Sequence, residues 1–316
     1  MVLDRQAEID QNPIGPVLAS IIAIARLFAL QMKPIDRPHL LNAFNWRSDV
    51  LQESIRYEPT YDLGAIWTIG TGSVGTAVLY FLTLAMQQFS SVLFDMDDVK
   101  IHNLDRSPIF TARDADLRIR KVHATAAYLR SVGVRDVTPE PEPLDKSDFW
   151  LSRQAGTPDL VIAAANERDV RSLIERSAPP LQIYGTTGAN WEASVVRHVP
   201  LVDACSCCLF PPDAQELPTV CATGGVTLPT GEETVDAALP FLSFAAGLMA
   251  AAEILKTTIP GYPFSPNRTT LYTHPEVLPR FVSSSVARRT SCLCASRRSS
   301  LHRAMIQGTK YERLSR

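Results

Sequence analysis

The stretch that decides the fold runs from residue 66 to residue 75 and reads Ile66-Trp-Thr-Ile-Gly70-Thr-Gly72-Ser-Val-Gly75. An apolar run that meets closely spaced glycines predicts a buried strand, a tight turn and a helix whose amino end can hold phosphate. Gly70, Gly72 and Gly75 are therefore candidate nucleotide-binding residues. This pattern alone is typical of dinucleotide-binding proteins and does not identify the ligand.

The next predicted strand ends in an acidic cluster, Phe94-Asp95-Met-Asp97-Asp98-Val99, and Asn103 and Arg106 follow. Asp95 stands where a dinucleotide-binding protein carries the acid that binds a ribose. A dehydrogenase has no use for a second acid and an arginine beside the phosphates. The combination favours a triphosphate whose α-phosphorus is attacked, because fixed cations stabilise the charge that develops there.

Short apolar segments alternate with helical patterns through the middle of the chain. Strands are expected over residues 65–69, 91–94, 137–139, 159–164, 181–184 and 193–198, and helices over residues 74–87, 116–131, 168–177 and 237–256. This β-α-β alternation predicts an α/β, Rossmann-like fold with a mainly parallel sheet covered by helices on both faces.

The composition limits the classes of partner. With 316 residues and 46% hydrophobic content the chain can bury a large core, and a net charge of −2 gives no reason to expect nucleic acid or a membrane surface. Residues 14–32 are strongly apolar but are interrupted by Arg26, which favours a buried or interface helix over a membrane span. No basic segment precedes them, so no secretory signal is indicated and the predicted compartment is the cytoplasm.

The six cysteines form two close pairs and two further residues. Cys205 and Cys208 make one pair and Cys292 and Cys294 the other, while Cys207 and Cys221 remain. Close pairs far apart in a cytoplasmic chain indicate a metal site before disulfides. Two alternatives stay open: Cys207 replaces Cys294 as the fourth ligand, or the thiols are reduced and hold no metal.

Taken together, the motifs at residues 70–75, 95–99 and 103–106, followed by Arg120-Lys121, resemble those of the E1-like activating enzymes. That superfamily includes the ThiF and MoeB enzymes and the ubiquitin-activating E1 proteins. The resemblance continues through residues 205–211 and 221–226 and the helix that ends at Lys256, and it covers roughly residues 60 to 295. It implies ATP-dependent adenylation of the C-terminal carboxylate of a ubiquitin-like or sulfur-carrier protein.

The resemblance also implies roles for single residues. Asp95 would hold the ribose hydroxyls, and Arg106 and Lys121 would neutralise phosphate charge. Asn103 would donate to phosphate oxygens or orient them. Backbone amides after Gly70 would line the phosphate path. The alternative reading makes Arg106 and Lys121 surface charges and Asn103 a helix cap.

One departure from the family pattern concerns the magnesium ligand. Family members carry an acid after the strand that here spans residues 160–165, and this chain has Asn166 followed by Glu167. A neutral amide is a poorer Mg²⁺ ligand than a carboxylate. Either Glu167 or Asp169 supplies the missing charge, or Asp97 and the phosphates hold the metal, or adenylation is weak or lost.

The cysteines acquire specific expectations from the resemblance. The two pairs would form a structural Zn²⁺ site that pins the C-terminal segment to the domain. Cys221 lies in a long segment at about residues 211–233 that corresponds to a crossover loop, and it would receive the acyl group as a thioester. The alternative makes Cys221 a small apolar loop residue.

Three segments follow from this interpretation: residues 1–60 as a helical N-terminal extension, 61–280 as the adenylation domain, and 281–316 as a basic C-terminal segment with the second cysteine pair. The expected partners are the carrier protein, an E2-like protein and a second copy of the chain in a homodimer. Competing hypotheses are an inactive E1-like scaffold subunit, an enzyme that adenylates a peptide or another small carboxylate, and an NAD(P) oxidoreductase.

Overall fold

A computed structural model gives the fold. The structure describes residues 13–28, 41–43, 45–48, 62–85, 88–152, 158–165, 168–177, 179–188, 190–200, 202–209, 225–227, 234–236, 239–259, 266–274 and 278–295. Over these residues no helix is both long and apolar enough to cross a membrane.

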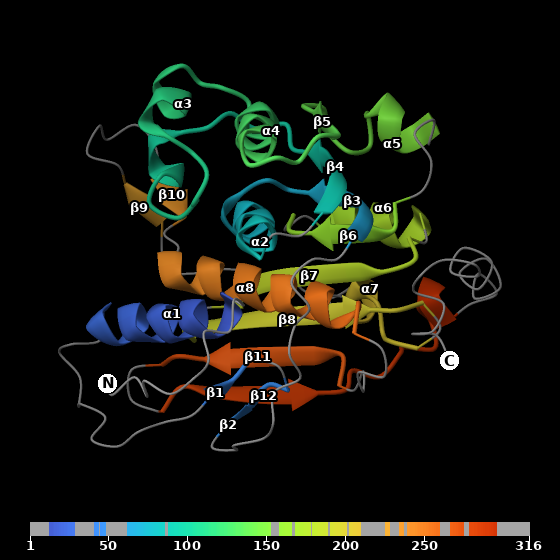
Figure 1. Cartoon of the computed structure of the whole chain (residues 1–316). Coiled ribbons are helices and arrows are strands. Elements are labelled where there is room, and N and C mark those ends of the chain that lie inside the picture. Colours follow the sequence, from blue (N-terminus) through green and yellow to red (C-terminus); the bar gives the residue numbers. More distant parts are fainter. Residues whose placement is uncertain are drawn as a thin grey trace.

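An eight-stranded sheet in the order β12-β11-β8-β7-β6-β3-β4-β5 forms the centre of the molecule (Figure 1). Its strands are β3 (Asp62–Ile69), β4 (Gln88–Phe94), β5 (Val137–Glu140), β6 (Leu160–Ala163), β7 (Gln182–Gly188), β8 (Glu192–His198), β11 (Arg268–Tyr272) and β12 (Arg280–Ser284). Five neighbouring strands, β7, β6, β3, β4 and β5, run parallel to one another. Strands β8, β11 and β12 extend the sheet beyond β7 in antiparallel fashion.

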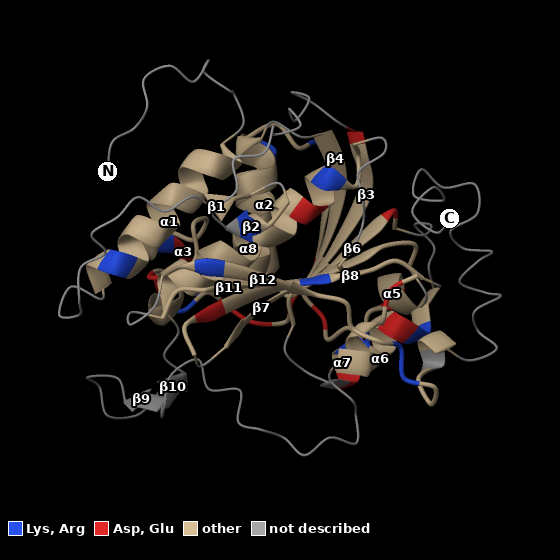
Figure 2. Ribbon diagram, turned by 90° about the horizontal axis from the view of Figure 1, so that it is seen from below, with Lys and Arg blue, Asp and Glu red and all other residues tan. Residues whose placement is uncertain are grey.

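Helices cover both faces of this sheet, as Figure 2 shows with the sheet seen from its edge. One face carries α1 (Ile14–Phe28), α2 (Ser73–Leu84), α4 (Lys121–Ser131) and α8 (Pro240–Lys256), and the other carries α5 (Asp148–Ser152) and α6 (Arg168–Ser177). Alternate strand residues divide between these layers: Ile66 belongs to the core under α2 and α8, and Trp67 to the core under α5 and α6. This is the period of two that a strand buried on both faces requires.

Small residues allow α2, α8 and the sheet to approach closely. A Cβ atom added at Gly247 of α8 would lie 2.4 Å from Cβ of Ala77 in α2, and one at Gly185 of β7 would lie 2.7 Å from Cγ1 of Val74. The helix that follows the glycine turn is therefore locked between α8 and β7, which fixes the direction of its amino end.

The fold confirms the predicted α/β class and the parallel sheet with helices on both faces, and it corrects two details. The helix expected over residues 116–131 begins only at Lys121, because Arg118 adopts a left-handed conformation (φ 47°) and Asp98 pairs with Arg120 in a β-bridge. A separate short helix, α3 (Ala112–Asp116), precedes this break and is capped by Thr111.

The second correction concerns the N-terminal extension. Its described part contains not only α1 but also a hairpin of β1 (Leu41–Asn42) and β2 (Arg47–Ser48), which lies beside β12 (Figure 1). The remaining short elements are η1 (Ile101–Asn103), α7 (Ser206–Leu209), β9 (Gly225–Thr227), β10 (Thr234–Asp236) and η2 (Leu293–Ala295). The three predicted segment boundaries stay a prediction.

Candidate functional site

The glycine turn after β3 has the conformation and the close contacts that require glycine. Gly70 has a φ of +87°, and an added Cβ would lie 2.9 Å from the backbone nitrogen of Ala165. At Gly75 an added Cβ would lie 2.0 Å from the carbonyl oxygen of Gly70, while Gly72 has open space and caps α2. The turn therefore folds back tightly on α2 and packs against the chain after β6.

Asp95 lies at the carboxyl end of β4, and its carboxylate is held in place by three donors. Oδ2 accepts from the backbone N–H of Thr71 at 2.7 Å and from its hydroxyl at 3.2 Å, and Oδ1 accepts from the N–H of Asp97 at 3.0 Å. Burial raises the pKa of Asp95, against the lowering effects of Lys121 and these N–H donors. The glycine turn and the acidic strand end are thus joined through one carboxylate.

Lys121 is the first residue of α4, and it makes two contacts with Asp97. Its ammonium lies 2.7 Å from Oδ2 of Asp97, and its backbone N–H donates to the Asp97 carbonyl at 2.9 Å. The Lys121 side chain is 12% exposed but that of Asp97 is 58% exposed. Since a pair open to solvent adds little stability, we interpret this one as holding the ammonium in position.

A pocket of about 520 Å³ lies at the carboxyl ends of β3, β4 and β6, a size within the range of small-molecule sites. Of the predicted nucleotide-binding and catalytic residues it brings together five, namely Gly70, Gly72, Asp95, Asp97 and Lys121. It is also lined by Asp169, in the first turn of α6. Ligands of open α/β sheets bind at this edge.

Other predicted residues do not line this pocket. Asn103 and Arg106 lie beyond it on and after η1, and Oδ1 of Asn103 accepts from the N–H of Lys100 at 2.9 Å. The Asn103 side chain thus caps a turn, as its alternative reading expects. Gly75 is buried behind the turn and shapes it without lining the pocket. Asn166, Glu167 and Cys221 lie outside the described residues.

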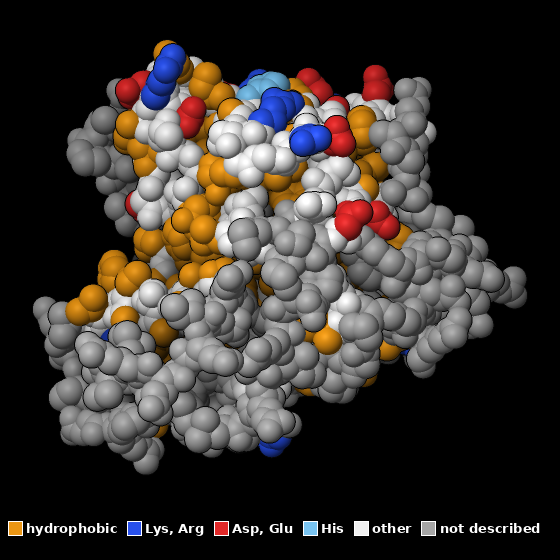
Figure 3. All heavy atoms as spheres, in the orientation of Figure 1, with side chains coloured by type: hydrophobic (Ala, Val, Ile, Leu, Met, Phe, Trp, Pro, Cys, Tyr) orange, Lys and Arg blue, Asp and Glu red, His pale blue; other side chains and the backbone are white. Residues whose placement is uncertain are grey.

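Sequence reasoning missed a fourth contribution to the pocket, from the connection between β5 and α5. Glu142, Asp145 and Lys146 line it there and are exposed. The sequence held a sign of this contribution, because residues 137–139, now in β5, were predicted as a strand of the parallel sheet. The residues after it had to reach the same edge as those after β3 and β4. Charged side chains of both signs also mix over α3 and α4 on the face shown in Figure 3.

The two cysteine pairs come together beside α6, from α7 and the residues before it and from the chain at η2. The Sγ atoms of Cys205 and Cys292 lie 3.3 Å apart, those of Cys208 and Cys294 3.4 Å, and those of Cys205 and Cys208 3.8 Å. All four side chains are buried, and their Sγ atoms lie within 4.8 Å of one another. Cys207 is not one of these four thiols; it hydrogen-bonds to Cys205, and its Sγ lies 3.9 Å from Oγ of Ser172 on α6.

These distances fit a metal better than a disulfide. A disulfide needs an S–S distance of about 2.05 Å, whereas four thiolates at about 2.3 Å from a tetrahedral Zn²⁺ lie about 3.8 Å from one another. The donor set is all sulfur, buried and four-coordinate, as in structural zinc sites. Cys294 rather than Cys207 supplies the fourth thiol, so the Cys-x-Cys spacing does not prevent the cluster from forming.

Comparisons with known proteins agree with this geometry. The model of the ThiF family matches residues 64–294. Similar solved folds include E. coli MccB with ATP (16% identity, TM-score 0.54, covering 73% of this chain and 66% of MccB). A second is the microcin C7 biosynthetic enzyme MccB in complex with N-formylated MccA (18% identity, TM-score 0.53, 73% and 67% coverage). The chain thus spans about two thirds of the length of these structures, and no curated protein matches it.

Proposed function

Because this chain belongs to the ThiF family, we propose that it is an E1-like adenylyltransferase that activates the C-terminal carboxylate of a ubiquitin-like or sulfur-carrier protein. The observation that carries the proposal is the pocket at the ends of β3, β4 and β6. It unites the glycine turn, the carboxylate of Asp95 and the ammonium of Lys121 at one edge of the sheet. The carrier class comes from the motifs quoted above, and the pocket itself supports nucleotide chemistry.

In the proposed reaction a carboxylate oxygen of the carrier attacks the α-phosphorus of ATP. The bond from that phosphorus to the oxygen bridging to the β-phosphate breaks, and pyrophosphate leaves with the electron pair. Asp95 accepts from the ribose hydroxyls, backbone amides after Gly70 donate to phosphate oxygens, and Lys121 balances charge on the phosphates. These are positioning and electrostatic contributions, which dominate phosphoryl-transfer catalysis.

The acids that line the pocket fit a divalent cation. Asp97 and Asp169 both reach it, and Mg²⁺ is commonly held by one or two carboxylates together with substrate phosphates. Bound Mg²⁺ would neutralise charge on the phosphates. We assign Asp169 as the acid that compensates for Asn166, since it is one of the two acids that the sequence offered. Arg106 is proposed to reach the phosphates from beside the pocket, with Asn103 holding the η1 turn before it.

The second step would transfer the acyl group to Cys221. The thiolate attacks the acyl carbon of the adenylate, a thioester forms, and AMP leaves with the electron pair of the broken acyl–phosphate bond. Sequence alone supports this step. A homodimer and an E2-like acceptor complete the proposed set of partners.

We further propose that the cysteine cluster binds structural Zn²⁺. A closed, four-sulfur site holds its ion without an open position for substrate. The cluster would tie the loop before α7 to the chain at η2, 86 and 87 residues further on. Its contribution is to folding rather than to chemistry.

A second candidate is adenylation of a peptide or another small carboxylate. The similarity to MccB structures that contain ATP or MccA favours it. The two candidates share the pocket and differ only in the acceptor.

The test is ATP–pyrophosphate exchange with the full chain and carrier proteins ending in Gly-Gly, compared with short peptides of the same C-terminal sequence. Carrier-dependent exchange that persists in Cys221→Ala, with loss of a reducible carrier adduct, supports adenylation followed by thioester transfer. Exchange with peptides alone favours the second candidate. Nucleotide binding without exchange for any acceptor contradicts both and favours the inactive scaffold.

A further inference from the structure

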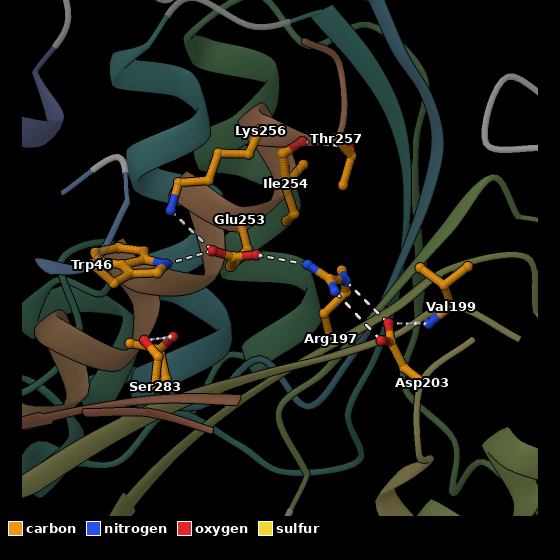
Figure 4. A network of polar contacts seen from close by, with 10 residues as sticks. Trp46, Arg197, Val199, Asp203, Glu253, Ile254, Lys256, Thr257 and Ser283 are labelled. Carbon is orange, nitrogen blue, oxygen red and sulfur yellow. Dashed lines mark hydrogen bonds and ion pairs between the residues drawn. The ribbon is translucent and has the colours of Figure 1, made fainter. Parts of the chain in front are cut away.

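Four charged side chains form a buried network that runs from α8 through β8 to Asp203 (Figure 4). Lys256 and Glu253 come from α8, Arg197 comes from β8, and Asp203 lies in the loop that leads to Cys205. Their exposed fractions are between 0% and 7%. The nucleotide chemistry proposed above uses none of them. Buried charges are costly unless each is paired, so this set of two cations and two anions needs an explanation.

The network holds the loop of the first cysteine pair at one point, Asp203. Its Oδ2 accepts from Nε of Arg197 and from the N–H of Val199, both at 3.0 Å. Its backbone carbonyl lies 3.1 Å from Nδ1 of His198. Cys205 is two residues further on, so the Arg197–Asp203 pair is one of the contacts that position the first cysteine pair, together with that of Cys207 to Ser172 on α6.

Arg197 connects that loop to α8. Its Nη1 lies 3.6 Å from Oε2 of Glu253, so the guanidinium bridges two buried carboxylates. The other oxygen of Glu253, Oε1, accepts from Nζ of Lys256 at 3.0 Å. If Glu253 lost one of its contacts, the Arg197 guanidinium would be held less firmly, and so would the Asp203 carboxylate that it binds.

The last member of the network comes from the N-terminal hairpin. Nε1 of Trp46 donates to Oε1 of Glu253 at 2.5 Å, and Nζ of Lys256 lies 3.7 Å from the centre of the Trp46 ring. Trp46 also packs on Phe281 of β12 at 4.8 Å between ring centres. Trp46 adopts a positive φ of 57°, which places it at the tight turn between β1 and β2.

We propose that the contacts Trp46–Glu253–Arg197–Asp203 position the cysteine cluster, and that docking of the hairpin at residues 41–48 thereby slows the release of its metal. The inference rests on the zinc site proposed above. Metal release requires the loop of Cys205 to move away from Cys292, and that movement must disturb Asp203. Each hydrogen bond to a buried carboxylate that is removed lowers the resistance to this movement.

The experiment measures the rate at which zinc passes from the zinc-loaded full chain to a colorimetric chelator. Trp46→Phe keeps an aromatic ring against Phe281 and Lys256 but removes the Nε1–H donor to Glu253. We expect release about 5-fold faster, the effect of losing one hydrogen bond of ordinary strength. Asp203→Asn should accelerate release about tenfold or more. Trp191→Phe is the matched control, because Trp191 contacts Phe241 and His274 and lies outside the network.

The double variant separates positioning from a general loss of stability. If Trp46 acts through Asp203, Trp46→Phe adds little to the effect of Asp203→Asn, whereas independent effects multiply. A second measurement needs no variant: by reciprocity, removing zinc from the wild-type chain should raise amide hydrogen exchange in residues 41–48 but not in α2.

Wild-type release rates for Trp46→Phe, multiplicative rates in the double variant, or unchanged exchange at residues 41–48 would each overturn the inference. A wild-type chain that binds no zinc would overturn the metal site and with it this inference, and ATP–pyrophosphate exchange would report separately on the proposed enzyme.

Discussion

The nucleotide pocket and the cysteine cluster are built in opposite ways. The pocket is assembled at an open sheet edge from residues that directly follow β3, β4, β5 and β6, and several of its charged side chains are exposed. The cluster is a closed set of four buried thiols from two segments more than 80 residues apart. The first is open to a ligand from solvent, and the second, as we propose, holds a metal ion enclosed. We therefore expect substitutions in the pocket to impair function with little loss of stability, and substitutions in the cluster to do the reverse.

The largest effect should follow from breaking the cluster. Cys205→Ser removes one of four sulfur ligands, and we expect loss of bound zinc and a fall in melting temperature of about 10 °C or more. Cys207→Ser is the matched control, because Cys207 is buried beside the cluster but is not part of it. Zinc content and thermal unfolding check both variants. Equal zinc content in the two would remove the distinction between Cys207 and the four clustered thiols.

The glycine turn offers a second test within the pocket. Gly75→Ala must move the Gly70 carbonyl, since the added Cβ would lie 2.0 Å from that oxygen. We expect a stability loss of about 2 kcal/mol or more, the typical cost of overpacking, together with weaker ATP binding. Gly72→Ala meets nothing within 4 Å and should cost less than about 1 kcal/mol. Urea unfolding and calorimetric titration with ATP measure both quantities, and similar losses in the two variants would contradict this account of the turn.

Asp95 tests the expectation that a pocket residue matters more for ATP binding than for the stability of the fold. Burial raises its pKa, so its charge is held unfavourably in the fold and contributes no stability at neutral pH. Asp95→Asn should weaken ATP binding about tenfold, with a smaller loss of stability than Gly75→Ala, because the amide removes the buried charge but keeps one of the two acceptor oxygens. Asp136→Asn, in the second pocket at the opposite end of β4, should change neither quantity. A marked destabilisation by Asp95→Asn would show that the carboxylate is structural.

The last of these tests concerns pH and the buried network of α8. Burial lowers the pKa of Lys256 to about 8 from an ordinary 10.5, against the opposing pull of Glu253. Between those pH values the unfolded chain binds the proton and the folded chain does not. The free energy of unfolding then rises with pH, by at most about 1.4 kcal/mol per unit. Lys256→Met removes this rise, so its stability relative to wild type should fall between pH 8 and pH 10 in urea unfolding. If the stability of Lys256→Met and that of wild type changed in parallel between pH 8 and pH 10, the lowered pKa of Lys256 would be contradicted.

How much of this could be predicted depends on how far apart the interacting residues lie in sequence. The strand, turn and acid of the pocket lie within 30 residues, and their pattern predicts both the fold and the site. The cluster was predictable from spacing, because two close cysteine pairs far apart in a sequence are typical of a metal site. The break before Lys121 was not, because it depends on the left-handed Arg118 and on the β-bridge between Asp98 and Arg120.

The buried network was also beyond sequence reasoning. Trp46 and Glu253 lie 207 residues apart, and no local pattern marks a glutamate that will be buried against an arginine and a lysine. Asn103 shows the opposite limit. Its spacing favoured a contact with phosphate, which stays a prediction, and the structure shows in addition that its Oδ1 accepts from the N–H of Lys100 in the turn. Local backbone hydrogen bonds compete for such side chains.

The most direct test of the proposed activity is the rate of ATP–pyrophosphate exchange in wild type, Lys121→Met and Arg135→Met, with a carrier protein ending in Gly-Gly. Lys121 lines the nucleotide pocket, and Arg135 lines the pocket at the other end of the sheet. The account predicts exchange in wild type and Arg135→Met and a loss of about 100-fold or more in Lys121→Met. Equal exchange in Lys121→Met and wild type would show that adenylation does not occur where the structure assembles these groups.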